Sequence, residues 1–210
     1  MKKKIEFLPI GIQNWYRNLI SPATNFFIKH GVNPNFFTTV GLLVSILTTY
    51  VFAKGYLRLG GVLILLGGTF DIVDGSVARA TKRETKFGAL YDSTLDRYSE
   101  VIIFLGLAYY FNFVEGELIF AGNDISLFIV FTIFVALGGS IMTSYIRARA
   151  EGLGLECKVG AMQRPERIVY LGFGAIFHKY TLILALILIA VLSNATAIHR
   201  LYHVWKKENK

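Results

Sequence analysis

The sequence has few charged residues and almost no cysteine. Only 17% of its 210 residues are charged, whereas a soluble domain of this size carries about 25%. The single cysteine, Cys157, has no partner within the chain, which excludes a fold held together by internal disulfides. With 54% hydrophobic residues and a mean hydropathy of +0.51, the chain is also too apolar to be disordered. This composition is typical of a membrane protein.

Long hydrophobic runs dominate the sequence, and a helix needs about 20 such residues to cross a bilayer. The fifth run is short, but Pro165 favours an earlier start for its helix, because proline suits the first helical turn. We therefore predict an all-α integral membrane protein with six transmembrane helices. The six runs are Phe36–Ala53, Leu59–Ala78, Ala89–Phe111, Ile125–Ile146, Ile168–His178 and Tyr180–Ile198.

The basic residues orient these helices. The formal net charge is +8, and most of the 22 basic residues, including Lys2–Lys4, lie in the segments that an even number of crossings places on one side. The opposite side has the acidic loop with Glu115, Glu117 and Asp124. Cytoplasmic loops carry an excess of lysine and arginine, so we predict a multi-pass plasma-membrane protein with both termini in the cytoplasm. Nucleic-acid binding is disfavoured because the basic residues flank apolar runs instead of covering one soluble face.

The segment before the first run mixes apolar, aromatic and basic side chains. Between Leu8 and His30 this mixture, with Trp15 and Tyr16, predicts an amphipathic helix that lies in the membrane interface and contacts membrane lipids. A solvated arm packed on the cytoplasmic face is the alternative. The sequence contains no internal repeat, so we expect a single domain over 1–210. Residues 1–35 form its cytoplasmic or interfacial segment, and 36–205 form the six-helix bundle.

Acidic residues lie inside two of the apolar runs. Asp71 and Asp74 are three residues apart in the second run, and Asp92 and Asp96 are four apart in the third, so each pair shares one helical face. Ionisable residues are costly in a membrane span, which makes a functional role the first hypothesis. A buried ion pair with Arg97 would explain one or two of these acids but not all four. The short loop between the two runs brings both pairs together near the cytoplasmic side.

Such a cluster of carboxylates predicts a divalent-metal site. Four anions this close repel one another unless cations are present. Hard oxygen ligands in this number suit Mg²⁺ or Mn²⁺, and two ions would fit. Small residues at Gly75, Ala78 and Gly88 leave room for a ligand, and Arg79 can hold a phosphate. We therefore expect a nucleotide or diphosphate site.

These acidic and small residues resemble the signature of the CDP-alcohol phosphotransferase family, D-x2-D-G-x2-A-R-x8-G-x3-D-x3-D. Its eight fixed positions are matched without departure by Asp71, Asp74, Gly75, Ala78, Arg79, Gly88, Asp92 and Asp96. The resemblance implies a six-helix membrane enzyme, usually a homodimer, that transfers a substituted phosphate from a CDP-linked donor to an alcohol and releases CMP. It also implies that Asp71, Asp74 and Asp92 bind metal.

The same resemblance gives roles to the other signature residues. It implies that Asp96 is the general base and also touches a second metal ion, and that Gly75, Ala78, Arg79 and Gly88 shape the CDP pocket. The segment from Asn33 to Thr38 resembles the P-N-x-x-T entry to the first span of this family, which implies contacts of Asn35 and Thr38 with the nucleotide. Alternatively, Asn33 only caps the helix that Pro34 begins.

Three basic blocks in the second half of the chain resemble the prokaryotic phosphatidylinositol-phosphate synthases of this family. They are Ser144–Glu151, Arg164–Arg167 and Arg200–Trp205. The resemblance implies that Arg147, Arg167 and Arg200 bind the phosphate of the acceptor, inositol 1-phosphate, and that the donor is CDP-diacylglycerol. Arginines at helix ends are also expected from membrane topology alone.

Other functions are compatible with parts of this pattern. A glycerol 3-phosphate acceptor would make the protein a phosphatidylglycerol-phosphate synthase, and an archaeal ether-lipid donor or a CDP-inositol donor would need the same signature. A cation transporter could use Asp71, Asp74, Asp92 and Asp96 as its ion path. It would need acids through the full depth of the membrane, whereas these lie near one side.

Overall fold

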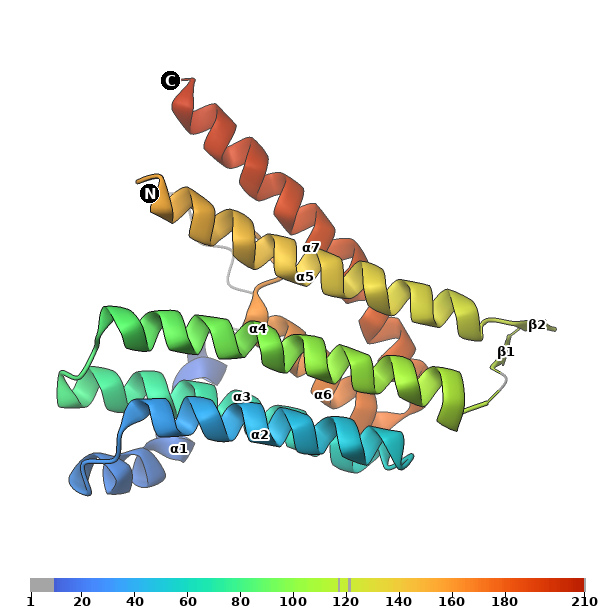
Figure 1. Cartoon of the computed structure of the whole chain (residues 1–210), viewed down its shortest axis with the longest axis horizontal. Helices are drawn as coiled ribbons and strands as arrows, with labels where there is room; N and C mark the ends of the chain where they lie inside the picture. The colour runs from blue at the N-terminus through green and yellow to red at the C-terminus, as the bar shows by residue number, and fades with distance from the viewer. Residues whose placement is uncertain (1–9, 117, 121, 210) are drawn as a thin grey trace.

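The computed structural model describes residues 10–116, 118–120 and 122–209, and in this part the chain is almost entirely helical (Figure 1). Lys2–Lys4 and Glu117, on which the orientation partly depends, lie outside the described residues. Two short elements, the π-helical turn η1 (Tyr110–Val114) and an antiparallel pair of strands, β1 (Ile119–Phe120) and β2 (Asn123–Asp124), connect α4 to α5. The α-helices are α1 (Ile10–Lys29), α2 (Pro34–Ala53), α3 (Leu57–Thr81), α4 (Lys86–Tyr109), α5 (Ser126–Gly152), α6 (Arg164–Phe177) and α7 (Lys179–Glu208).

The all-α prediction is confirmed, and helices α2 to α7 coincide with the six apolar runs. Within the described residues, α2, α3, α5 and α7 are long and apolar enough to cross a membrane. Helix α4 carries the charged residues of the third run, and α6 has only 14 residues. At 1.5 Å per residue α6 is about 21 Å long, less than the roughly 30 Å hydrocarbon core. That all six helices cross the membrane therefore stays a prediction.

Local capping explains where the helices around the site begin. The Asn33 side chain accepts a hydrogen bond from the backbone N–H of Asn35 at 3.0 Å, and Pro34 occupies the first turn of α2. Thr85 caps α4 in the same way, because its Oγ1 accepts from the Gly88 N–H at 2.9 Å. Helix α4 therefore begins at Lys86 and not at Ala89, which adds almost one turn before Asp92.

Helix packing divides the bundle into two groups that meet at α6. Helix α2 packs on both α3 and α4, α5 packs on α7, and α6 packs on α3 and α7. In Figure 1, α2, α3 and α4 run side by side, while α5 and α7 diverge towards the C-terminus. The main core contains Phe52, Phe104 and Leu107, all 1% exposed or less. Large apolar side chains such as Leu47 and Phe131 instead face outwards, as lipid-facing residues do.

Helix α1 packs beside the second apolar run. The Tyr16 hydroxyl is hydrogen-bonded to Thr69 of α3, and Phe27 packs on a small core formed by Phe37, Val73 and Val77. This helix bears out the helical part of the prediction for 8–30. The side chain of Trp15 lies outside the described residues. Whether α1 lies in the membrane interface stays a prediction.

The connections define the two ends of the bundle (Figure 1). At one end the α3–α4 turn lies against the α1–α2 turn, where Arg83 Nη1 donates to the Gly31 carbonyl at 2.8 Å. At the other end Lys179 donates to Glu115 at 2.5 Å, and the Tyr110 hydroxyl also donates to Glu115. Burial alone would raise the pKa of Glu115, but these hydrogen bonds and the Lys179 charge hold it below the usual range.

Candidate metal and nucleotide site

Three of the predicted metal ligands meet where α3 and α4 approach each other. Asp71 and Asp74 come from α3 and Asp92 comes from α4, and each offers a carboxylate oxygen within 4.8 Å of the other two. Asp74 is only 7% exposed. The acids thus lie on the facing sides of α3 and α4, two helices that both pack on α2. We call Asp71, Asp74 and Asp92 the aspartate triad.

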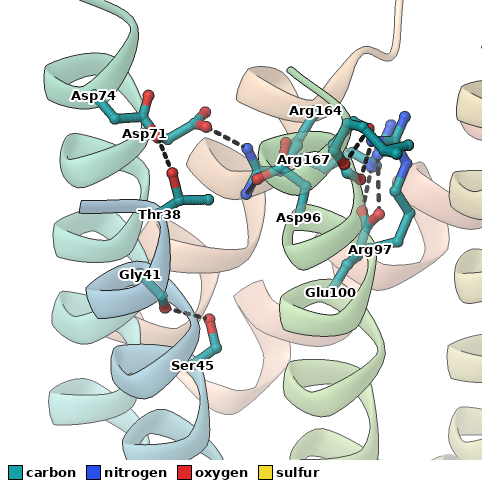
Figure 2. Close-up of polar contacts among 12 residues, drawn as sticks. Thr38, Gly41, Ser45, Asp71, Asp74, Asp96, Arg97, Glu100, Arg164 and Arg167 are labelled. Carbon is teal, nitrogen blue, oxygen red and sulfur yellow. Dashed lines mark hydrogen bonds and ion pairs between the residues drawn. The ribbon is translucent and has the colours of Figure 1, made fainter. Parts of the chain in front are cut away.

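Asp96 lies outside this triad and is joined to it through an arginine. Arg164, in the first turn of α6, pairs through Nη2 with Asp96 Oδ1 and through Nη1 with Asp71 Oδ1, both at 2.7 Å (Figure 2). The fourth signature acid therefore has an environment of its own, as expected if its role differs from that of the other three. Three helices, α3, α4 and α6, meet at this point.

The surroundings of the triad test whether it fits a metal ion. Thr38 on α2 donates a hydrogen bond to Asp74 Oδ2 at 2.9 Å and so fixes this carboxylate. Asp92 Oδ1 is buried and has no hydrogen-bond partner among the described residues. A buried carboxylate oxygen without a partner is costly unless something binds it. Together with the other oxygen donors, it fits a hard divalent cation.

A cleft of about 210 Å³ opens beside the triad, between the start of α2, the end of α3 and the start of α4. Arg79 folds back over Gly75, and a side chain at Gly75 would meet its guanidinium at 3.2 Å. Gly88 faces Asn35 and Thr85. The structure thus brings every residue predicted for the nucleotide to one cleft with the metal site at its wall: Asn35, Thr38, Gly75, Ala78, Arg79 and Gly88 line it with Asp74 and Asp92.

A second, narrower cavity of about 50 Å³ extends from the acids into the bundle. All four signature aspartates, Arg164 and Arg167 line its polar part, and apolar residues of α2, α3, α4 and α6 line the remainder. Its lining thus changes from polar beside the acids to apolar within the bundle. A substrate with a charged head and an apolar tail would match this change in polarity.

The three arginines predicted for the acceptor phosphate come from three helices, α5, α6 and α7. Arg147 is exposed and pairs with Glu151 at 2.9 Å. Arg167 and Arg200 are 1% and 2% exposed, and both are engaged within the protein.

The buried arginines have different partners. Arg167 donates to both carboxylate oxygens of Glu100, at 2.6 and 3.1 Å (Figure 2). Arg200 donates to the carbonyls of Val159 and Thr143, at 2.8 and 2.5 Å. Helix α7 continues to Glu208, so Arg200 lies about two turns before its end instead of at the end. These bonds fix the two guanidinium groups in place.

Sequence reasoning missed two charged residues of the site, Arg164 and Glu100. A signal for Glu100 was present, because Asp92, Asp96 and Glu100 are spaced by four and share one face of α4. Arg164 belonged to the basic block Arg164–Arg167, but only Arg167 of that block was given a role. Arg164 lies far along the chain from the acids, and only the packing of α6 on α3 shows that it reaches Asp71.

An acid cluster at the junction of apolar helices, with a polar cleft beside it, marks a functional site of a membrane protein. The family model described as CDP-alcohol phosphatidyltransferase matches residues 31–205. The chain therefore belongs to the CDP-alcohol phosphatidyltransferase family and is an enzyme of this type.

Relatives with known names support this family, and they include synthases of archaetidylinositol phosphate and of phosphatidylinositol phosphate. The archaetidylinositol phosphate synthase of Methanothermobacter thermautotrophicus is 37% identical over 195 residues, 91% of each chain. The phosphatidylinositol phosphate synthase of Mycobacterium tuberculosis with CDP-DAG bound has a TM-score of 0.77 and 30% identity, covering 90% of this chain and 94% of the other. The same enzyme with manganese and citrate has a TM-score of 0.76 and 31% identity, covering 88% of both chains.

The manganese complex and the aspartate triad together indicate a divalent-metal site in this chain. The triad supplies the oxygen donors, and Thr38 orients one of them. The apolar helices and the family indicate a multi-pass membrane protein.

Proposed function

We propose that this protein transfers a phosphatidyl-type group from a CDP-linked lipid to inositol 1-phosphate, giving phosphatidylinositol phosphate and CMP. The observation that carries the proposal is the folding of residues 71–96 into one acid cluster with the nucleotide cleft beside it. The inositol phosphate acceptor is supported by the names of the relatives, which cover about nine-tenths of the chain. Arg167, which lines the cavity beside these acids, suits a phosphorylated acceptor.

In the proposed reaction the donor lies in the 210 Å³ cleft, with Arg79 on its phosphates. Asp71, Asp74 and Asp92 would hold Mg²⁺ or Mn²⁺, and the bound ion would supply positive charge for the diphosphate and the departing CMP. A hydroxyl of the acceptor forms a bond to the lipid-linked phosphorus, the bond from that phosphorus to CMP breaks, and the hydroxyl proton passes to Asp96. Arg164 holds the Asp96 carboxylate in place.

The second cavity supports a lipid donor. Its polar end is lined by the acids and its remainder is apolar. At about 50 Å³ it is too small for an acyl chain, so the tails of a donor whose diphosphate reaches the triad would pass sideways between helices into the lipid. The proposal includes six spans and an active site that faces the cytoplasm, from which a soluble inositol phosphate would arrive. We also propose that the enzyme works as a homodimer, as the family resemblance implies.

An archaeal ether-lipid donor is a second candidate, because the relative with 37% identity is an archaetidylinositol phosphate synthase. Both candidates share the acceptor and differ in the lipid tails. Purified protein should be given CDP-diacylglycerol or its ether analogue, CDP-archaeol, with a panel of acceptors, and CMP release measured. We expect CMP release with inositol 1-phosphate and little with glycerol 3-phosphate or free inositol. A preference for glycerol 3-phosphate would contradict the proposed acceptor, and the two donors would decide between the candidates.

Arg147 provides the cleanest test of the acceptor site, because it is exposed and its pair with Glu151 contributes little to stability. We expect Arg147→Ala to raise the KM for inositol 1-phosphate, with the KM for the donor almost unchanged. A charge-assisted hydrogen bond contributes about 1.5–3 kcal/mol, so kcat/KM should fall by roughly 10- to 150-fold. The matched control is Arg149→Ala on the same helix. Equal effects of Arg147→Ala on both substrates would assign this arginine a structural role.

A further inference from the structure

The guanidinium of Arg164 lies between two of the signature carboxylates. Its Nη1 is 2.7 Å from Asp71 Oδ1 on α3, and its Nη2 is 2.7 Å from Asp96 Oδ1 on α4 (Figure 2). All three side chains are about one quarter exposed or less. The planar fork of arginine can bind two oxygens at once in a fixed geometry. The protein thus supplies a cation of its own to two acids of the proposed metal site.

Asp71 is shared between this arginine and the aspartate triad, whereas Asp96 is not. The triad places oxygens of Asp71, Asp74 and Asp92 within 4.8 Å, and Arg164 is paired with only one of these three residues. Asp96 lies beyond the triad, and the ion pair that the structure gives it is the one with Arg164. An ion on the triad can therefore bind while Arg164 keeps Asp96. An ion that uses Asp96 as a ligand is opposed by the Arg164 guanidinium, which already contacts this carboxylate.

We propose that Arg164 competes with a second divalent ion for Asp71 and Asp96, so that the site binds one ion tightly and a second ion weakly. This inference rests on the proposed metal site at the triad. The second ion displaces the guanidinium from Asp96, because both cations use the same carboxylate oxygens and repel each other. Arg164 is thus a positioning residue for Asp96 that also sets how many ions the site holds.

The proposal is tested by titrating the purified full-length protein with Mn²⁺ alone and measuring free Mn²⁺ by electron paramagnetic resonance. The variant is Arg164→Gln, which keeps much of the side-chain length but removes the charge. The matched control is Arg147→Gln, the same change at an arginine whose partner, Glu151, lies outside the acid cluster. We expect one tight and one weaker site in the unmodified protein. Arg164→Gln should tighten the weaker site by roughly 10- to 100-fold, since it removes charge-assisted bonds that compete with the ion.

Two further measurements separate this inference from the metal site itself. Asp96→Asn should remove the second ion both from the otherwise unmodified protein and from the Arg164→Gln variant, whereas Asp74→Asn should weaken the first. An unchanged or weaker second site in Arg164→Gln would overturn the competition, and so would two equally tight sites in the unmodified protein. If Mn²⁺ bound to no variant, the proposed metal site would fail as well.

Thermal stability gives an independent readout if Arg164→Gln folds poorly. Arg164→Lys keeps the charge, but a single ammonium does not reproduce the paired geometry of the guanidinium. In EDTA, we expect Arg164→Lys to melt at a lower temperature than the unmodified protein, because the acids are less well neutralised. Added Mn²⁺ should then raise its melting temperature by more than it raises that of the unmodified protein. An equal or smaller rise would contradict the competition.

Discussion

Asp96 is the signature acid that the structure sets apart from the other three. It belongs to α4, as Asp92 does, but its carboxylate is paired with Arg164 and lies outside the triad. A group in this position can accept a proton while the triad holds the metal. Its role as a general base can therefore be tested without removing a triad ligand.

We expect Asp96→Asn to abolish turnover while the CDP-linked donor still binds. Asparagine keeps the size of the side chain but cannot accept the proton of the attacking hydroxyl. Loss of such a group reduces the rate by about 10²- to 10⁴-fold. The measurement is CMP release, with donor affinity determined in parallel. Near-normal CMP release from the variant would contradict the assignment.

Glu100 and Arg167 form a buried pair with two parallel hydrogen bonds, at 10% and 2% side-chain exposure. Removing one partner of such a pair leaves the other charge buried, which costs about 3–5 kcal/mol. We expect Glu100→Gln to lower the free energy of unfolding by an amount of this order in an SDS titration. Glu151→Gln is the matched control, since the exposed pair with Arg147 should contribute less than about 1 kcal/mol. Equal effects would show that Glu100 is not structural.

At the level of single residues, the sequence predicted the acids better than the arginines. Asp71 and Asp74 share one face of α3 because their spacing matches the helical period, and Asp92 meets them because α3 and α4, joined by a short turn, both pack on α2. The contacts of Arg164 and Arg167 depend on how α6 packs, and a pattern of residues within one helix does not contain that information. Thr38 was predicted as a nucleotide contact, and its hydrogen bond to Asp74 was not foreseen.

At the level of helices, the apolar runs predicted which helices exist and their order along the chain more accurately than the residues at which each helix begins and ends. Asn33 and Thr85 fix the starts of α2 and α4 through side-chain hydrogen bonds in the loops, which hydropathy does not report. The short fifth run was expected to begin near Pro165, and α6 begins at Arg164. Beyond α4 the chain continues as the π-helical turn η1, which the sequence did not indicate.

The end of the bundle opposite the site should respond to acid. Burial opposes ionisation of Glu115, but hydrogen bonds from Lys179 and Tyr110 keep its pKa below the usual range in the folded protein. A lowered folded pKa stabilises the fold above the unfolded pKa, and this contribution is lost as the pH falls through the folded value. We therefore expect Glu115→Gln to lower the melting temperature at pH 7, with the difference from the unmodified protein shrinking below about pH 4. A constant difference across this range would contradict the argument.

The orientation of the whole molecule in the membrane can be tested by labelling introduced cysteines, because the one native cysteine is buried. Cys157 is 0% exposed, and burial raises the pKa of its thiol, so it should react slowly with maleimides. Exposed positions at the two ends are Lys86, at the start of α4, and Ile119, in the hairpin. In intact cells that produce the protein, we expect a membrane-impermeant maleimide to label Ile119→Cys but not Lys86→Cys. In permeabilised cells the maleimide should label both variants. Labelling of Lys86→Cys but not of Ile119→Cys in intact cells would contradict an active site that faces the cytoplasm.

The division of the bundle into α2–α4 and α5–α7 has a consequence for how such enzymes diversify. The cleft beside the aspartate triad is built from the first group, whereas the arginines proposed for the acceptor come from the second. Selection for a new headgroup can therefore act on α5–α7 while the nucleotide chemistry is inherited unchanged. The exception is the first turn of α6, where Arg164 and Arg167 reach back to acids of α3 and α4. Recombination between family members would have to keep that turn together with the acids that it contacts.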